Sequence, residues 1–192
     1  MKAFLYILGL IIIFISPFLG ETQINIKDIF EFSNSSNMVF WDLRVARVFL
    51  AFFVGGILAL SGLIFQIIFK NELITPYTLG IASGTTLFTA IGIILLPTVY
   101  IFISSILGSL FTILVLYIIS KIINKTSIGS STNSILLIGI ALSYFYASAL
   151  MLVFYMSSLQ ENYSIVRFTL GSLDTVGFSN SFVIFFVSIV FY

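Results

Sequence analysis

The longest uncharged segment of the chain most constrains its fold. Residues 73–120 form a run of 48 residues without Asp, Glu, Lys or Arg. A membrane-spanning helix needs roughly 20 apolar residues, so two crossings fit into this run. Over the whole chain 60% of the residues are hydrophobic and 8% are charged, whereas a soluble domain carries about 25% charged residues. The sequence therefore predicts an all-α integral membrane protein, a polytopic helical bundle.

Apolar segments predict about six transmembrane helices, at residues 3–19, 48–69, 77–96, 99–120, 135–156 and 178–192. Pro97 separates the third helix from the fourth. Residues 121–134 are expected to form a solvent loop, and residues 157–177 a mixed stretch. The first apolar segment is interpreted as an uncleaved span, because it reaches Leu19 and no small-x-small cleavage site follows.

Composition also argues against several classes of function. The chain has no Cys and no His, so neither a metal site nor an imidazole-based catalytic site is expected. Enzymatic activity and a cofactor are not expected either. The formal net charge of +1 without a basic patch argues against a nucleic-acid partner. No charge lies deep inside a predicted span, which disfavours proton-coupled carriers and implies that another subunit would supply the energy for transport.

The charges at the span ends give a preferred orientation. Lys2 next to the first span favours a cytoplasmic N-terminus. Counting Lys and Arg gives four on each side, so the positive-inside rule alone does not decide the orientation. The inner loops are shorter, however, and the rule is most reliable for short loops. We therefore expect residues 121–134 in the cytoplasm and residues 23–37 in the periplasm of a bacterial inner membrane.

Small residues recur at helical spacing and predict close helix packing, because in lipid close backbone approach replaces the hydrophobic drive between helices. These candidate packing residues are Gly55, Ala59 and Gly62, the GxxxG pair Gly80 and Gly84, and Gly139 with Ser143. Gln66 follows on the same face as Gly62, and an amide at membrane depth needs a hydrogen-bond partner or a water-lined cavity. Both pathway lining and a hydrogen bond between helices are compatible with this residue.

Four ordered blocks resemble the FecCD/BtuC-type permeases, the membrane subunits of type II ABC importers for iron-siderophores, haem and cobalamin. The first block joins LRVAR at residues 43–47 to VGGILALSG at 54–62 and Gln66. The second, NELITPYTLGIASG at 71–84, is similar to the family's NPLA-(D/E)P-x-x-LG-(I/V)-x-x-G signature. LLIGIALS at 136–143 resembles the LLLAGIAL segment, and RFTLGSL at 167–173 resembles W-x-x-GS-(L/F). Glu72 departs from the signature, where the family has proline.

The resemblance implies a function and a set of partners. The chain would be the permease subunit of an ATP-driven importer that moves an iron chelate, siderophore or haem, or cobalamin from periplasm to cytoplasm by alternating access. Its partners would be a second permease subunit, in a homo- or heterodimer, a cytoplasmic ABC ATPase dimer, a periplasmic substrate-binding protein and membrane lipid. Family members have about ten spans, so the chain resembles an N-terminal part, and we expect it to insert in a membrane without transporting by itself.

The resemblance also assigns candidate site residues. Arg44 and Arg47, expected at the outer mouth of the second helix, correspond to arginines that pair with glutamates of the binding protein. The alternative is that both side chains snorkel to lipid phosphate. The cytoplasmic gate would include Asn71 and Leu73, together with Thr132 and Asn133, and capping of the following helix is the alternative for the last two.

Two other classes of function compete with the importer. A self-contained channel or secondary carrier would be expected to show ionisable residues at the midplane or inverted repeats of broken helices, and the sequence shows neither. A non-transporting membrane scaffold is the other class. A neighbouring gene for an ABC ATPase or a periplasmic binding protein would count strongly against a scaffold.

Overall fold

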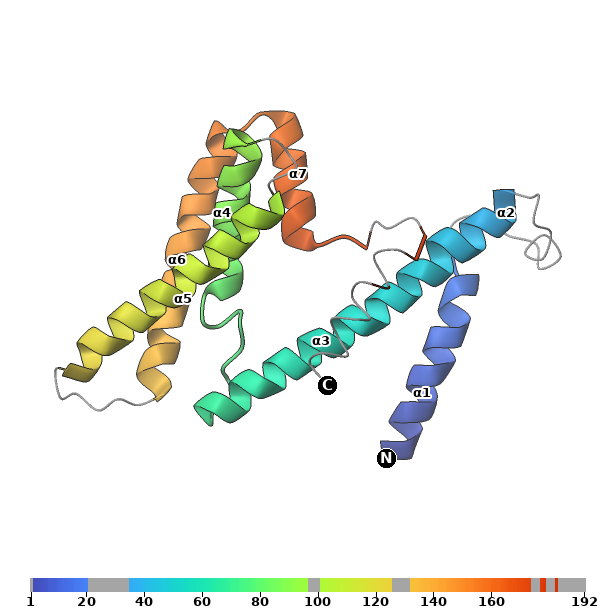
Figure 1. Ribbon diagram of the computed structural model, residues 1–192, viewed down its shortest axis with the longest axis horizontal. Helices are drawn as coiled ribbons and strands as arrows, with labels where there is room; N and C mark the ends of the chain where they lie inside the picture. Colours follow the sequence, from blue (N-terminus) through green and yellow to red (C-terminus); the bar gives the residue numbers. More distant parts are fainter. Residues whose placement is uncertain are drawn as a thin grey trace. The chain divides into compact units, whose positions relative to one another are not determined.

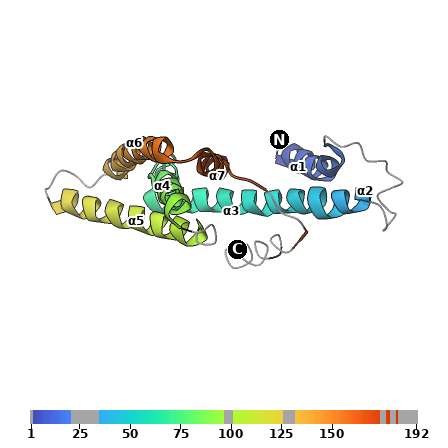
Figure 2. The same ribbon diagram turned by 90° about the horizontal axis from the view of Figure 1, so that it is seen from above.

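The structure, a computed structural model, describes residues 2–20, 35–96, 101–125, 132–173, 177, 178 and 182. Within these ranges the chain forms helices joined by turns and contains no strand (Figures 1 and 2). The predicted all-α class is confirmed. The chain divides into two compact units, one of Met1–Leu60 with Leu173–Tyr192 and the other of Ser61–Ser172. The following paragraphs describe each unit by itself.

The first unit contains the N-terminal helices. Helix α1 (Lys2–Ile15) continues into the 3-10 turn η1 (Ser16–Phe18), where Pro17 occupies an early position that needs no backbone N–H donor. Helix α2 (Ser35–Met38) runs through the π-helical stretch η2 (Val39–Val45) into α3 (Ala46–Phe69). The ring of Phe18 packs on that of Phe40, with centroids 5.3 Å apart. This contact joins η1 to η2.

The second unit is a bundle around a short central helix. Helix α4 (Ile81–Leu95) contacts α5 (Ile101–Lys125), α6 (Thr132–Met156) and α7 (Leu159–Leu170). Figure 2 shows α4 between α5 and α6. One face of α4 is buried, with Gly84, Leu87, Thr89, Ala90, Gly92 and Ile93. The packed centre of this unit therefore lies along α4.

Small residues and hydroxyl groups bring α4 and α5 together. A Cβ built on Gly92 would lie 2.7 Å from the Ser104 Cβ, so only glycine fits this crossing. Less than one helical turn away, the buried Thr89 hydroxyl lies 2.9 Å from the Ser105 hydroxyl. In a membrane, apolar helix faces gain little free energy by packing on one another, because lipid tails are equally apolar. Interhelical hydrogen bonds therefore help to hold the two helices together.

Several element boundaries differ from the predicted ones. The second helix is continuous from Ser35, whereas the sequence placed its start at Val48, because polar residues lower hydropathy without ending a helix. Helix α4 begins at Ile81 and not at Tyr77, since residues before it form turns. Helix α5 extends to Lys125, into the expected loop, and α6 begins at Thr132.

The stretch of mixed composition at residues 157–177 contains a helix, α7, that was not predicted from the sequence. Ser158 and Glu161 form a capping box at the start of this helix. The helix is amphipathic, so a search for long apolar segments passes over it. Of the sixth predicted span, residues 178–192, only Phe178 and Phe182 are among the described residues.

Three helices of the described ranges are long and apolar enough to cross a membrane: Ser36–Phe69, Ile101–Ile122 and Ser134–Met156. Two further apolar helices are shorter, Ile7–Phe18 and Ile81–Leu95. The chain is therefore a multi-pass membrane protein, and the count of six spans is approximate.

Candidate functional site

The first candidate site is the turn that joins α3 to α4, residues 70–80. Lys70 ends α3 with a left-handed backbone, φ 50°, and the following amide of Asn71 donates to the Gln66 carbonyl at 3.2 Å. The Asn71 side chain accepts from the Leu73 amide at 2.9 Å. The Gln66 side chain donates to the Glu72 carbonyl at 3.0 Å. Gln66 therefore binds the backbone of the turn in its own unit.

Two threonines supply hydrogen-bond partners for backbone amides in the middle of this turn. The Thr75 amide donates to the Thr78 hydroxyl at 2.8 Å, and the Thr78 amide donates to the Thr75 hydroxyl at 3.1 Å. At the start of α4, the amide of Ile81 donates to the Pro76 carbonyl at 3.1 Å. Backbone groups without partners are costly at membrane depth, and these local bonds supply the partners.

The turn packs directly on α6. Gly139 of α6 lies against Thr78 and Leu79, and Gly80 adopts φ 76°, a conformation that glycine adopts readily. A Cβ on Gly80 would stand 3.0 Å from the Gly139 carbonyl oxygen. The Ser143 hydroxyl donates within α6 to this same carbonyl at 3.0 Å. Turn and helix thus meet backbone to backbone.

Other predicted packing residues fall into two groups. Gly84 lies against Thr112 of α5 and Tyr146 of α6, and the Thr112 hydroxyl donates to the Tyr146 hydroxyl at 3.3 Å. A Cβ built on Gly55 or on Gly62 would meet no described atom within 4 Å apart from the adjoining backbone of α3, and Ala59 is exposed. The small residues of α3 thus lie on an open surface, whereas those of α4 and α6 are packed.

The four predicted gate residues come from two places. Asn71 is half-buried, and the Leu73 side chain is 69% exposed at the tip of the turn. Thr132 and Asn133 form the first turn of α6, and their side chains lie outside the described part of the structure. The turn meets α6 at Gly139, about two helical turns beyond Thr132.

The second candidate site contains the two arginines. Arg44 lies in the π-helical stretch and donates to the Pro17 carbonyl at 3.3 Å. Its guanidinium is so close to Gly20 that a Cβ there would lie 2.7 Å from Cζ. Arg47 is exposed and lines a groove of about 440 Å³ with apolar residues of α1 and α3 and with Ser16. The arginines therefore lie within a continuous helix, nine and twelve residues after its described start at Ser35, and have different surroundings.

The fold and these two sites can be compared with known proteins. Residues 7–192 match the FecCD transport family. The chain belongs to this family.

Among relatives of this FecCD chain is a protein named "Probable iron chelatin transport system permease protein" from Helicobacter pylori, 30% identical over 86% of this chain and 50% of the relative. A molybdate import system permease protein of Haemophilus influenzae is 32% identical over 71% of this chain and 40% of the relative. A solved structure of a metal-chelate type ABC transporter, in an inward-facing conformation, matches with a TM-score of 0.72 and 26% identity over 97% of this chain and 56% of that one. The FecCD chain spans about half the length of these relatives.

Two features of the sites were not predicted from the sequence of this FecCD chain. Thr75 and Thr78 form the reciprocal pair of the turn, and the pattern Thr-x-x-Thr after a helix end could have indicated it. The hydrogen bond from Arg44 to the Pro17 carbonyl joins residues 27 positions apart, so no local sequence pattern indicates it.

Proposed function

We propose that this chain contributes the membrane permease of an ATP-driven importer that moves a metal chelate from periplasm to cytoplasm by alternating access. The observation that carries the proposal is the family match over residues 7–192. The packed unit around α4 would supply a rigid body, since its helices meet through glycines and hydroxyls. The exposed small residues of α3 would leave a surface for further helices or a second permease subunit.

The proposed substrate is an iron chelate, siderophore or haem, or cobalamin. The Helicobacter pylori relative and the metal-chelate type structure support the chelate class. The described residues contain no group of three or more acidic, Cys or His side chains that could hold a metal. Any metal ion would therefore travel inside its chelate.

Molybdate is a second candidate substrate, because the Haemophilus influenzae relative is a molybdate import permease. An oxyanion of that size would need hydrogen-bond donors in the pathway, whereas a chelate presents a larger and partly apolar surface. The uptake measurement below separates the two.

The proposed partners are a second permease subunit, a cytoplasmic ATPase dimer and a periplasmic binding protein. Arg47 is exposed and would pair with a carboxylate of the binding protein. Arg44 would hold η1 against η2 through its hydrogen bond to the Pro17 carbonyl. Asn71 and Leu73 in the turn, with Thr132 and Asn133 at the start of α6, would form the cytoplasmic gate. The packing of the turn on Gly139 supports this assignment, since any shift of α6 has to move the turn with it.

The test is uptake in a bacterial strain that lacks its own importers. The chain is expressed as part of a permease of full family length, together with the ATPase and the binding protein encoded beside it, and uptake of radioactive ferric siderophore, haem, cobalamin and molybdate is measured. We expect uptake of one chelate that requires the binding protein and stops with an ATPase that binds but does not hydrolyse ATP. Uptake without the ATPase would instead show a self-contained carrier, and uptake of molybdate alone would replace the chelate.

A further inference from the structure

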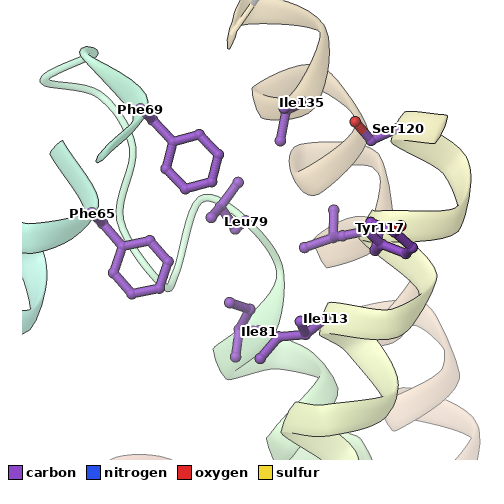
Figure 3. Close-up of a pocket in the computed structure, with 9 residues that line it drawn as sticks. Phe65, Phe69, Leu79, Ile81, Ile113, Tyr117, Ser120 and Ile135 are labelled. Atoms are coloured by element: carbon purple, nitrogen blue, oxygen red, sulfur yellow. The ribbon is translucent and has the colours of Figure 1, made fainter. Parts of the chain in front are cut away.

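A cavity of about 350 Å³ lies in the second unit, between the end of α3, the turn, α5 and the start of α6 (Figure 3). Figure 3 shows Phe65 and Phe69 on one side and Ile113 and Tyr117 on the other. The lining is almost entirely apolar, and the hydroxyls of Tyr117 and Ser120 are its polar side-chain groups. A cavity with so few polar groups does not suit a charged or strongly hydrated solute, because such a solute would lose its hydrogen bonds to water.

On the α5 side, the residues that line the cavity extend from Ile113 to Ser120. Ile113 and Ser120 are seven residues apart, which is about 10 Å along a helix axis. Ser120 lies close to Ile122, the end of the apolar span of α5. Phe69 is likewise the last residue of α3. The end of the cavity at Phe69 and Ser120, called its mouth from here on, would therefore lie where a hydrocarbon core gives way to lipid headgroups, and the rest of the cavity would lie at acyl-chain depth.

Positive charge gathers at this mouth. Lys121 is exposed directly after Ser120, and its ammonium lies 6.0 Å from the centre of the Tyr117 ring. Lys70 is exposed directly after Phe69. Glu72, also exposed, is the acidic residue of the adjoining turn. The described charges around the mouth thus sum to +1, which attracts an anionic headgroup and not a zwitterionic one.

We propose that this cavity binds one acyl chain of an anionic phospholipid, whose phosphate lies at Lys121. The apolar lining matches the chain, and the ammonium groups at the mouth match the phosphate charge. Tyr117 would contribute to binding both the acyl chain and the headgroup. Its ring lines the cavity, and the ammonium of Lys121 lies 6.0 Å from the centre of that ring. The proposal rests on the lining and the charges of this cavity, so it does not depend on the proposed substrate.

Quenching of tryptophan fluorescence by brominated lipids tests the site directly. The single native tryptophan is removed with Trp41→Phe, and Tyr117→Trp then places a reporter in the cavity wall while keeping an aromatic ring beside Lys121. The chain is reconstituted in vesicles that contain either dibrominated phosphatidylglycerol or dibrominated phosphatidylcholine. Tyr155→Trp in the same background is the control, because Tyr155 is 91% exposed near the other end of α6.

We expect phosphatidylglycerol to be preferred over phosphatidylcholine about fivefold at Tyr117→Trp and about equally at Tyr155→Trp, as one lysine near an anionic headgroup implies. Lys121→Gln should abolish the preference, whereas Arg167→Gln, at the end of α7, should leave it unchanged. Equal quenching by both lipids at Tyr117→Trp would overturn the proposal. Quenching by neither, with normal quenching at Tyr155→Trp, would show that polypeptide fills the cavity and would overturn it as well.

A second measurement needs no reporter in the cavity. The unsubstituted chain is purified from membranes and analysed by native mass spectrometry for retained phospholipid. We expect one anionic phospholipid per chain, lost in Lys121→Gln and kept in Arg167→Gln. Retention of no lipid, or of lipid in proportion to its abundance in the membrane, would contradict the proposal.

Discussion

Gly139 of α6 lies against the backbone of Leu79, so closely that a Cβ on Gly139 would stand 2.6 Å from the Leu79 Cα. The Thr78 carbonyl oxygen would be equally close to that Cβ. Backbone atoms cannot turn aside as a flexible side chain does, so an added methyl group has to push the turn and α6 apart. This contact sets how closely the turn before α4 approaches α6.

Gly139→Ala should therefore destabilise the chain. Overpacking of this kind typically costs about 1–3 kcal/mol, and a lower thermal midpoint in detergent is the expected result. Gly62→Ala is the matched control, because a Cβ on Gly62 would meet no described atom within 4 Å apart from the adjoining backbone of α3, and alanine favours a helix over glycine by about 1 kcal/mol. Equal midpoints for the two variants would show that the turn does not rest on α6.

Thr78→Val should loosen the turn without changing its shape. The substitution removes the hydroxyl that accepts from the Thr75 amide at 2.8 Å, a loss of about 1 kcal/mol. Hydrogen exchange at the Thr75 amide should accelerate in Thr78→Val and stay slow in Thr78→Ser, which keeps a hydroxyl. Thr86→Val is a further control, since the Thr86 hydroxyl only bonds back within α4. Slow exchange in Thr78→Val would exclude the role given to this pair.

The two arginines should separate into a structural and a docking residue. Arg44→Ala should lower the thermal midpoint, because it removes the bond to the Pro17 carbonyl. Arg47→Ala should weaken the binding-protein complex about tenfold or more, as expected for one lost charge-assisted hydrogen bond. Affinity is measured in lipid nanodiscs at low and high salt, and salt should weaken the wild-type complex more than the Arg47→Ala complex. Unchanged affinity and salt dependence would leave only lipid anchoring for Arg47.

The start of α7 should weaken in acid. The Ser158 backbone N–H and the Ser158 hydroxyl donate to the Glu161 carboxylate at 2.7 and 2.8 Å, and these bonds lower the Glu161 pKa below its ordinary value of 4.5. Since the pKa is lower in the folded protein, the stabilisation is complete above about 4.5 and is lost as the pH falls through the folded value. Below pH 4.5, wild type should approach Glu161→Gln in the exchange protection of the first turn of α7. A pH-independent difference between the two proteins would contradict this.

Single cysteines test the proposed orientation, and the chain has no native cysteine. One is placed at Ser35, before α3, and one at Ser130, between α5 and α6. A membrane-impermeant thiol reagent should label Ser35→Cys in intact spheroplasts and label Ser130→Cys only after the membrane is opened. The reverse pattern would place the N-terminus outside.

Hydropathy predicted the long spans well, because length and apolar composition determine insertion. The end of α6 at Met156 is the predicted one, and the uncharged run at residues 73–120 contains α4 and most of α5. Helix starts were less predictable. Ser35 and Asp42 are polar, yet the described helix begins at Ser35 and passes through Asp42, since hydropathy marks the limits of the apolar core and not the limits of the hydrogen-bonded helix.

The sites were predictable only in their local parts. The GxxxG pair and Gly139 were identified from spacing, but spacing does not say which helix faces them, and it did not distinguish them from the open glycines of α3. The bond from Arg44 to Pro17 depends on a chain reversal that no local pattern encodes. Helix α7 had a readable signal, Ser158 followed by Glu161 three residues later, which an apolar search does not use.

The shortness of α4 has a consequence for how this part of the chain meets a bilayer. Its 15 residues measure about 22 Å, less than the roughly 30 Å of a hydrocarbon core. A short span ordinarily thins the bilayer around it, but α4 is preceded by a turn whose backbone donors and acceptors are matched to one another by Thr75 and Thr78. The turn can therefore enter the hydrophobic layer along with α4. Helix and turn together would then form one composite span, and the hydrophobic mismatch would be resolved inside the protein without deforming the lipid.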